Sequence, residues 1–177
     1  MGYERLSAGQ APPEDINVVI EIPAQAAPVK YEFDKAAGML VVDRFLSTSM
    51  VYPCNYGFVP KTLCEDGDPV DVLVVTPLPL VHGCLIACRP VDLLAMRDEH
   101  GVDNKVLAVP RSYAGYADVG RVGDFRGGLE NQIRHFFEQY KAFEPGKWAE
   151  VGDFRGIEAG LAEIKRSIER YAETRTG

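Results

Sequence analysis

The segment 65–71 reads EDGDPVD and places Asp66, Asp68 and Asp71 within six residues. Gly67 permits a tight or left-handed bend, and Pro69 fixes its own φ angle. Asp71 leads directly into the apolar run 72–75, which would hold its side chain rigidly. Carboxylate oxygens that converge in this way are the ligands that Mg²⁺ prefers. The segment therefore predicts a site for a hard cation.

Two other interpretations of this acidic segment need to be weighed. Asp, Gly and Pro are also the residues of an ordinary solvated turn, and the segment taken alone supports that interpretation equally well. A calcium loop of the EF-hand type also begins with spaced aspartates, but here its twelfth position would be Pro77 instead of a bidentate Glu. No flanking helices are expected either, so the EF-hand interpretation fails.

A second acidic group occurs in the segment 96–105, MRDEHGVDNK, which lies between two apolar runs. As a hairpin loop it would be a plain polar tip. Asp98 and Asp103 flank that tip, however, so both strand ends can direct a carboxylate at one place, with Lys105 beside them. This second group favours the cation site over the plain turn.

A phosphate-handling enzyme also needs groups that bind phosphate oxygens. Lys30 and Glu32 share one face of a predicted strand, and Arg44 lies on the strand expected to pair with it. Arg suits bidentate phosphate contact, and Lys supplies a mobile point charge. Taken alone, Lys30 and Glu32 are more typical of a solvated face that carries a Lys–Glu pair.

Phenols are the third type of side chain that could contact a phosphate. The compact aromatic segment 52–60, YPCNYGFVP, contains Tyr52 and Tyr56, and a phenol can donate a hydrogen bond to a phosphate oxygen or simply pack the core. Tyr140 falls on the apolar stripe of a predicted helix, so core packing is its default interpretation. Lys141 follows it near the helix C-terminus, where a cation is favoured by the helix dipole.

The elements that position these side chains read as strands first and helices last. Residues 29–34 alternate strictly between apolar and polar, as a half-buried strand does, and Gly38 connects them to 39–46 as a hairpin. Further strands are expected at 16–22, 70–76, 85–95 and 105–109. Apolar steps of three and four residues predict helices over 129–143 and 157–173. Many short strands with Gly and Pro between them favour an antiparallel barrel or sandwich.

The hexapeptide VGDFRG occurs twice, at 122–127 and 151–156, once before each predicted helix. The flanking sequences do not repeat. We therefore expect coincidence, or a shared way of starting a helix with Gly at the turn, and not a repeat architecture.

Length and composition are those of one globular domain of 177 residues, with an N-terminal arm over 1–14. A net charge of −7 argues against nucleic acid as a partner. The chain has no apolar run long enough to cross a membrane, and its first 15 residues do not read as a signal peptide, so we expect a cytoplasmic protein. In that compartment its four cysteines are expected as free thiols.

These residues resemble the family I soluble inorganic pyrophosphatases of bacterial type. Residues 66–72, DGDPVDV, match the family signature D-x-D-P-x-D followed by an apolar residue. The likeness extends over roughly residues 14 to 171, through the order and spacing of Glu21, Lys30, Glu32, Arg44, Tyr52, Tyr56, Asp98, Asp103, Lys105, Tyr140 and Lys141.

The resemblance implies a mainly β, α+β fold: a five-stranded OB-like closed barrel with two C-terminal helices. It also implies a homohexamer made of two trimers. The implied reaction is the hydrolysis of pyrophosphate to two phosphates by a metal-activated water held between Mg²⁺ ions, without a covalent intermediate. Several Mg²⁺ ions would serve each site, with Mn²⁺ or Zn²⁺ as possible substitutes.

The resemblance further implies a role for each site residue. Asp66, Asp71 and Asp103 look like ligands of the catalytic metals, with Asp98 holding a further ion. Asp68 looks like the general base or the group that orients the nucleophile. The phosphate-binding set is Lys30, Arg44, Tyr56, Lys105, Tyr140 and Lys141. Glu21, Glu32 and Tyr52 look like supporting residues.

The sequence departs from the family pattern in two places. The segment 119–128, VGRVGDFRGG, is rich in Arg and Gly where family members usually carry an acidic, proline-containing stretch, which puts the conformation of this loop in doubt. Cys54 stands where the family often has a smaller residue, close to Tyr56. His135 is expected either at the contact between trimers or on a solvated helix face.

Two further function classes use the same predicted barrel. An OB-type module that binds nucleic acid or sugar would need a basic or aromatic open face, and the net charge of −7 counts against it. A structural Ca²⁺-binding protein would gain stability from Ca²⁺ without catalysing a reaction. Metal-dependent phosphate release separates the enzyme from both.

Overall fold

The computed structural model describes residues 5–174, so the arm expected over 1–14 is described only from residue 5. Its strands are β1 (Ile16–Ile22), β2 (Val29–Asp34), β3 (Met39–Phe45), β4 (Asn55–Phe58), β5 (Asp71–Val74), β6 (Leu85–Asp98), β7 (Gly101–Val102), β8 (Lys105–Pro110) and β9 (Ala149–Phe154). Its helices are α1 (Leu129–Gln139) and α2 (Ile157–Glu173), with short 3₁₀ helices η2 (Ala114–Tyr116) and η3 (Val122–Asp124).

Five strands form a closed ring. β1 pairs with β4, β4 with β5, β5 with β8 and β8 with β6, and β6 returns to pair with β1. The β5–β8 pair is parallel and the other four pairs of the ring are antiparallel, so the expectation of a wholly antiparallel barrel is wrong at this one pair. The long strand β6 continues beyond the ring and also pairs with β7 and β9. The predicted five-stranded architecture is confirmed.

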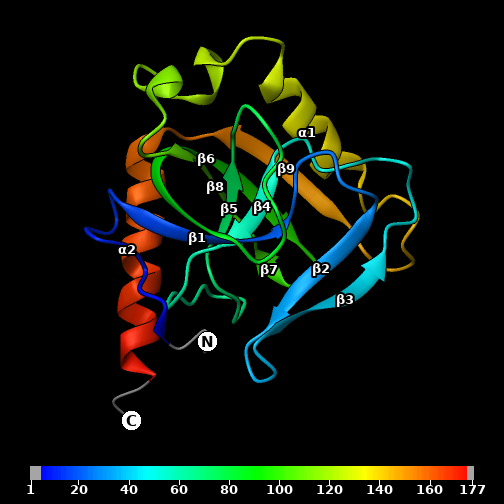
Figure 1. The fold of residues 1–177 in the computed structure, drawn as a ribbon. Helices are drawn as coiled ribbons and strands as arrows, with labels where there is room; N and C mark the ends of the chain where they lie inside the picture. Colours follow the sequence, from blue (N-terminus) through cyan, green and yellow to red (C-terminus); the bar gives the residue numbers. More distant parts are fainter. Residues whose placement is uncertain (1–4, 175–177) are drawn as a thin grey trace.

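β2 and β3 form a separate two-stranded sheet, as the alternating pattern and Gly38 predict. Gly38 has a φ of 68°, the left-handed conformation that glycine adopts without steric cost. Figure 1 shows this hairpin projecting beside the ring, with α1 and α2 on other sides of it. The hairpin can therefore supply one wall of a cleft against the ring.

Most residues of the ring strands are buried on both faces, which explains why these strands are largely apolar. Along β5 and β8, successive residues alternate between two hydrophobic clusters. One cluster continues into α1 through Ile133, Phe136 and Phe137. The other continues into α2 through Ile164, with Ile168 packed against it. The two helices thus complete two different sides of the core.

The structure corrects several expected boundaries. α1 ends at Gln139 instead of 143, and a series of turns follows it as far as the Pro145-Gly146 turn. The residue before a proline disfavours the helical region, so the helix cannot continue up to Pro145. The strand expected over 70–76 is limited to β5, and the one expected over 85–95 continues to Asp98. β4 and β9 are strands that the sequence pattern did not indicate.

The two VGDFRG copies adopt different structures. The first begins with η3, whereas the second lies mostly in β9. α1 and α2 each begin after a glycine with positive φ, Gly128 at 70° and Gly156 at 79°, but Gly128 lies outside the first copy and the two glycines differ in ψ, at 31° and 174°. The two copies therefore do not share one way of starting a helix, and the alternative expectation of coincidence holds. The buried carboxylate of Asp92 joins the two regions, because it accepts hydrogen bonds from the backbone N–H of Val122 (2.9 Å) and of Gly156 (2.7 Å).

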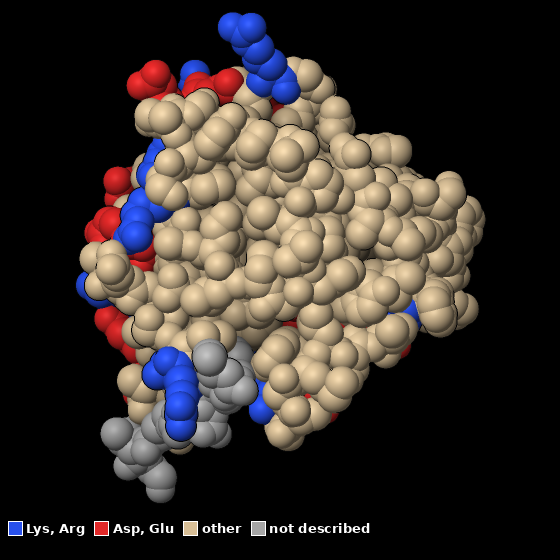
Figure 2. Space-filling view, in the orientation of Figure 1, with Lys and Arg blue, Asp and Glu red and all other residues tan. Residues whose placement is uncertain are grey.

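Within residues 5–174, no helix is both long and apolar enough to cross a membrane. All four cysteines are free, as expected, with Cys54 and Cys88 buried. Figure 2 shows a broad face of the molecule with few charged side chains, while most of the Asp, Glu, Lys and Arg in view lie along one edge. The loop between β5 and β6 crosses this face in front of β1 in the same orientation (Figure 1).

Candidate active site: an acidic cleft with paired cations

A cleft of about 380 Å³ lies between the acidic loop before β5, the β2–β3 hairpin and the turn that follows α1. Thirteen of the fourteen side chains that the sequence analysis assigned to a site line this cleft. They are Lys30, Glu32, Arg44, Tyr52, Tyr56, Asp66, Asp68, Asp71, Asp98, Asp103, Lys105, Tyr140 and Lys141. Segments far apart in the sequence therefore converge on one place, as the predictions required.

The acidic loop is held in shape by its own backbone. Cys64 N–H donates to the carbonyl of Asp68 at 2.7 Å, and Asp68 N–H donates to Oδ1 of Asp66 at 3.0 Å. Gly67, with a φ of 94°, takes the left-handed bend that the sequence predicted. Partial desolvation, together with the neighbouring carboxylates, raises the pKa of Asp66. The loop thus fixes the backbone of Asp68 and the carboxylate of Asp66, and both residues line the cleft.

The parallel strand pair brings Asp71, Lys105 and Asp103 together. Asp71 opens β5 directly opposite Lys105, which opens β8, and Asp103 precedes Lys105 by two residues. Lys105 Nζ lies 2.5 Å from Oδ2 of Asp71 and also donates to Asp103. Burial lowers the pKa of Lys105, but these two carboxylates outweigh it and hold that pKa well above its usual value. Burial raises the pKa of Asp103 to about 6.

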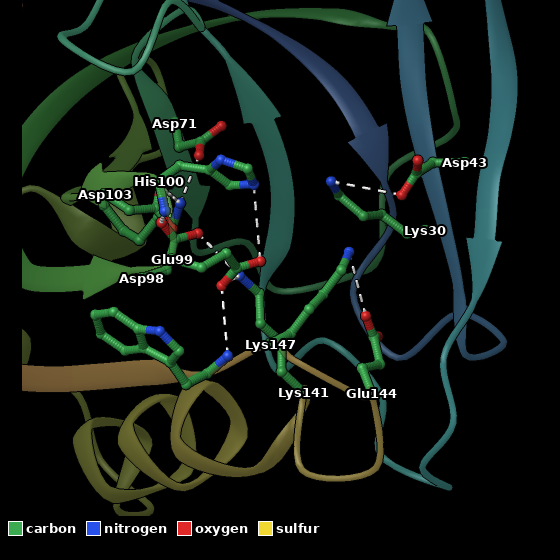
Figure 3. Close-up of polar contacts among 12 residues, drawn as sticks. Lys30, Asp43, Asp71, Asp98, Glu99, His100, Asp103, Lys141, Glu144 and Lys147 are labelled. Atoms are coloured by element: carbon green, nitrogen blue, oxygen red, sulfur yellow. Dashed lines mark hydrogen bonds and ion pairs between the residues drawn. The ribbon is translucent and has the colours of Figure 1, made fainter.

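A second pair of carboxylates holds Lys141. Its Nζ lies 2.8 Å from Oδ2 of Asp98 and 3.0 Å from Oε2 of Glu99 (Figure 3). Burial raises the pKa of Asp98, but hydrogen bonds from Lys141 and from the backbone N–H of His100 outweigh it and lower that pKa overall. Lys141 is therefore a buried ammonium with a fixed position.

A β-bulge in the hairpin places neighbouring residues on the same side. Lys30 pairs with Arg44 and Tyr31 with Val42, so Asp43 is the extra residue of the bulge. Such bulges re-aim side chains beside active sites. Oδ2 of Asp43 lies 3.7 Å from Lys30 Nζ and 3.4 Å from Arg44 Nε, so both strands supply charged groups to the cleft (Figure 3 shows the Lys30–Asp43 pair). The predicted cross-strand pairing of Lys30 with Arg44 is confirmed.

The three phenols form the apolar floor. Tyr52 packs against Tyr56 and Phe136 with ring centroids 5.2 and 4.4 Å apart, and Tyr140 stacks on Phe136 at 5.4 Å. Burial raises the pKa of all three tyrosines, so each phenol keeps its proton and can donate a hydrogen bond. Core packing and cleft lining are therefore combined in the same residues.

Glu21 is the one predicted residue outside this cleft, and it lines an adjoining pocket with Lys30, Tyr56 and Asp71. It is the extra residue of a bulge in β1, since Ile20 pairs with Gly57 and Ile22 with Tyr56. Its Oε1 accepts the backbone N–H of Phe33 at 2.7 Å. Burial raises the pKa of Glu21 to about 8.

Sequence reasoning missed four charged or titratable residues of the cleft: Asp43, Glu99, His100 and Lys147. Glu99 and His100 follow Asp98 directly, and Asp43 precedes Arg44. A strict two-residue strand period assigns Asp43 to the other face from Arg44, and only the bulge overrides it. Lys147 follows the Pro145-Gly146 turn, which folds the chain back toward the cleft; that turn was the available signal.

The charges of the cleft fit a site for divalent cations. Eight carboxylates line it against five Lys or Arg side chains, a formal excess of negative charge. Among residues 5–174, no three His, Cys, Asp or Glu side chains gather closely enough to hold a metal ion. Within the cleft, the Lys105 ammonium lies between the carboxylates of Asp71 and Asp103. The available donors are hard carboxylate oxygens at strand ends, as Mg²⁺ requires.

The two departures from the family pattern lie outside the cleft lining. Cys54 is buried in the cluster beneath Tyr56, and burial raises the pKa of its thiol to about 12. The loop 119–128 is ordered by Asp124, whose Oδ2 accepts the backbone N–H groups of Gly120 at 2.8 Å and Arg121 at 3.1 Å. His135 is exposed on α1.

Comparison with known proteins gives a consistent result. The family model described as inorganic pyrophosphatase matches residues 18–172. An inorganic pyrophosphatase of Ralstonia nicotianae is 53% identical over 173 residues, which cover 97% of this chain and 99% of that protein. The solved inorganic pyrophosphatase of Coxiella burnetii has a TM-score of 0.89 at 50% identity, covering 94% of this chain and 99% of that one. That of Thermus thermophilus has a TM-score of 0.91 at 40% identity, covering 97% and 99%. The chain described here belongs to the inorganic pyrophosphatase family.

Proposed function

We propose that this chain hydrolyses inorganic pyrophosphate to two phosphates in the cleft described above, using Mg²⁺ and no covalent intermediate. The observation that carries the proposal is the combination of excess carboxylates with five Lys or Arg side chains in one cleft. Pyrophosphate is strongly anionic, so carboxylates in excess would repel it unless divalent cations bound to them first. Once the carboxylates are neutralised, the Lys and Arg side chains of the cleft can contact the phosphate oxygens.

Asp66, Asp71 and Asp103 are the residues that would hold the catalytic Mg²⁺ ions, and Asp98 would hold a further one. All four carboxylates line the cleft. Bound Mg²⁺ supplies Lewis-acid activation of water and neutralises phosphate charge, and Mn²⁺ or Zn²⁺ could substitute. Burial raises the pKa of the Asp103 carboxyl to about 6, and a bound cation nearby would stabilise its ionised form.

Asp68 is the proposed general base. It is exposed at the tip of the acidic loop, where water reaches it, and it is fixed to that loop through its own backbone N–H and carbonyl. It takes a proton from the attacking water while the water oxygen forms a bond to phosphorus. The bond between that phosphorus and the bridging oxygen breaks, and the second phosphate leaves with the bridging oxygen.

The phosphate-binding set is Lys30, Arg44, Tyr56, Lys105, Tyr140 and Lys141. Its cations stabilise the charge that develops on the leaving phosphate. Because burial keeps Tyr56 and Tyr140 protonated, their phenols act as hydrogen-bond donors to phosphate oxygens. Glu21, Glu32 and Tyr52 support this set: Glu32 lies 2.5 Å from Lys30 Nζ, and Tyr52 packs against Tyr56.

The experiment that tests the proposal compares catalysis with binding. We expect the purified protein to release phosphate from pyrophosphate in the presence of Mg²⁺, and to show no salt-sensitive affinity for oligonucleotides. The excess of carboxylates in the cleft favours the first result. Salt-sensitive oligonucleotide binding without phosphate release would identify a binding module instead.

We also propose that residues 1–177 form one domain that assembles as a homohexamer of two trimers in the cytoplasm. Supporting the assembly, the face in Figure 2 carries few charges, and the loop that crosses it exposes Leu78 at 74% and Val81 at 71%. Exposed apolar side chains on a face with few charges are typical of interaction surfaces. Light scattering coupled to size-exclusion chromatography measures the assembly: a mass six times 19.5 kDa is expected, and a monomer would contradict the proposal.

The four free cysteines agree with the proposed cytoplasmic location, because that compartment is reducing.

A further inference from the structure

Glu144 is an almost buried carboxylate in the turn after α1. Only 10% of its side chain is exposed. Its two cationic partners, Arg44 from the β2–β3 hairpin and Lys147 from the same turn, both line the cleft. Figure 3 shows the Lys147 side chain directed toward Glu144. Glu144 thus lies where two separate walls of the cleft meet.

The contacts of Glu144 are electrostatic and only partly satisfied. Its Oε2 lies 3.5 Å from Nη1 of Arg44 and 3.4 Å from Nζ of Lys147, beyond the usual hydrogen-bond range. Its Oε1 is buried and makes no hydrogen bond within the described part of the chain. The buried Nε of Arg44 makes none either. Arg44 therefore keeps unused hydrogen-bonding capacity beside Glu144, and Lys147 Nζ is held near Glu144 by charge at 3.4 Å and not by a short hydrogen bond.

Lys141 provides the contrast within the same cleft. Its carboxylate partners Asp98 and Glu99 lie at 2.8 and 3.0 Å, which are true charge-assisted hydrogen bonds that fix the position of the ammonium. Glu144 does not fix Arg44 and Lys147 in this way. Its negative charge partly neutralises both of them while leaving their donors open.

We propose that Glu144 is a positioning residue that competes with phosphate for Arg44 and Lys147 and so limits how tightly product phosphate is held. This inference rests on the proposed function, in which Arg44 binds phosphate. A phosphate oxygen placed between Arg44 and Lys147 meets repulsion from the neighbouring Glu144 carboxylate. That repulsion weakens the binding of the product and speeds its release, a step that often limits turnover.

The test is Glu144→Gln, which keeps the shape of the side chain and removes its charge. We expect the inhibition constant Ki for phosphate to fall about tenfold at saturating Mg²⁺, because the negative charge that repels phosphate is lost. We expect kcat to fall with it, because the product leaves more slowly, while KM for pyrophosphate does not rise. The matched control is Glu138→Gln, an exposed acid on α1, for which Ki and kcat stay at the wild-type values.

A purely structural role for Glu144 predicts the opposite sign, since a disordered Arg44 would bind phosphate less well. An unchanged or higher Ki for phosphate in Glu144→Gln would therefore overturn the inference. If that variant fails to fold, Lys147→Gln provides a second test. In Lys147→Gln, Arg44 is the one remaining cationic partner of Glu144, so the Glu144 carboxylate neutralises Arg44 more fully and Ki for phosphate rises about tenfold. An unchanged Ki would also contradict the inference.

The outcomes separate this inference from the function on which it rests. If the wild-type protein releases no phosphate from pyrophosphate, the proposed function fails. If the wild-type protein is active and Glu144→Gln has the same phosphate Ki, only the role of Glu144 fails.

Discussion

At the scale of single residues, each lysine or arginine that lines the cleft faces at least one carboxylate. Lys105 lies against Asp71 and Asp103, Lys141 lies against Asp98 and Glu99, and the remaining three pair with Glu32, Asp43 or Glu144. Under the proposed function, we expect these pairs to exchange partners when a divalent cation or a phosphate binds. Metal and phosphate binding would then be linked, and we expect each to strengthen the other.

The pKa of Glu21 gives a prediction for stability. Burial raises this pKa from 4.5 to about 8 in the folded protein, so between these values the folded chain binds a proton that the unfolded chain has lost. Stability therefore falls as pH rises through this window, by on the order of a few kcal/mol in total. Glu21→Gln stays neutral and avoids this loss, so its advantage in Tm over the wild type grows from pH 4.5 to about 8 and then levels off.

Thermal unfolding of both proteins in a metal chelator, across this pH range, provides the measurement. A difference in Tm between Glu21→Gln and the wild type that does not change with pH would show that Glu21 is not held in this buried, protonated form.

At the scale of elements, the β2–β3 hairpin carries Lys30 and Arg44, two of the proposed phosphate-binding residues, whereas the proposed metal carboxylates lie on the loop before β5 and at or next to the ends of β5, β6 and β8. We expect Lys30→Ala and Arg44→Ala each to weaken phosphate binding about tenfold or more, since each loses a charge-assisted contact. Their affinity for Mg²⁺ changes much less, because the proposed metal carboxylates lie on other elements. Product inhibition by phosphate and Mg²⁺ titration measure the two effects, with the exposed Lys165→Ala as control. Unchanged product inhibition would contradict this division.

The close antiparallel pairing of β4 with β1 depends on Gly57. A Cβ added there would lie 1.9 Å from the carbonyl oxygen of Val19, closer than backbone atoms tolerate. We expect Gly57→Ala to lower the free energy of unfolding by about 1–3 kcal/mol or more, as overpacking does. Gly120→Ala, whose Cβ would meet only the Asp124 side chain at 3.7 Å, is the matched control. Equal urea midpoints for the two variants would show that β4 relaxes freely.

These elements also show where sequence reasoning succeeds and where it stops. The hairpin and both helices follow from local periodicity, and the acidic residues of the site follow from their spacing. The bulges at Glu21 and Asp43 have no local signal, because they arise from how two strands pair. β9 could not be predicted from its hexapeptide, since the same six residues begin with a 3₁₀ helix in their other copy. β4 contains Asn55 and Gly57, both of residue types that are depleted in strands.

At the scale of the whole molecule, the closed ring explains why one cleft can collect side chains from so many segments. Asp71 and Lys105 lie side by side because each is the first residue of its strand in the parallel β5–β8 pair. The hairpin and the turn after α1 form the other walls of the cleft. The chain as a whole is acidic at −7, and the cleft repeats that sign locally. An acidic protein that acts on an anion requires bound cations, which is the central claim of the proposed function.

The most direct test of this claim is phosphate release from pyrophosphate by the wild type, Asp71→Asn and the exposed control Asp118→Asn, with saturating Mg²⁺ and with a chelator. We predict release by the wild type and Asp118→Asn only when Mg²⁺ is present. In Asp71→Asn, release falls by about 100-fold, because a metal ligand that supplies several kcal/mol of transition-state stabilisation is lost while the shape is kept. Near-normal release by Asp71→Asn at saturating Mg²⁺, or full wild-type activity in the chelator, would contradict the account.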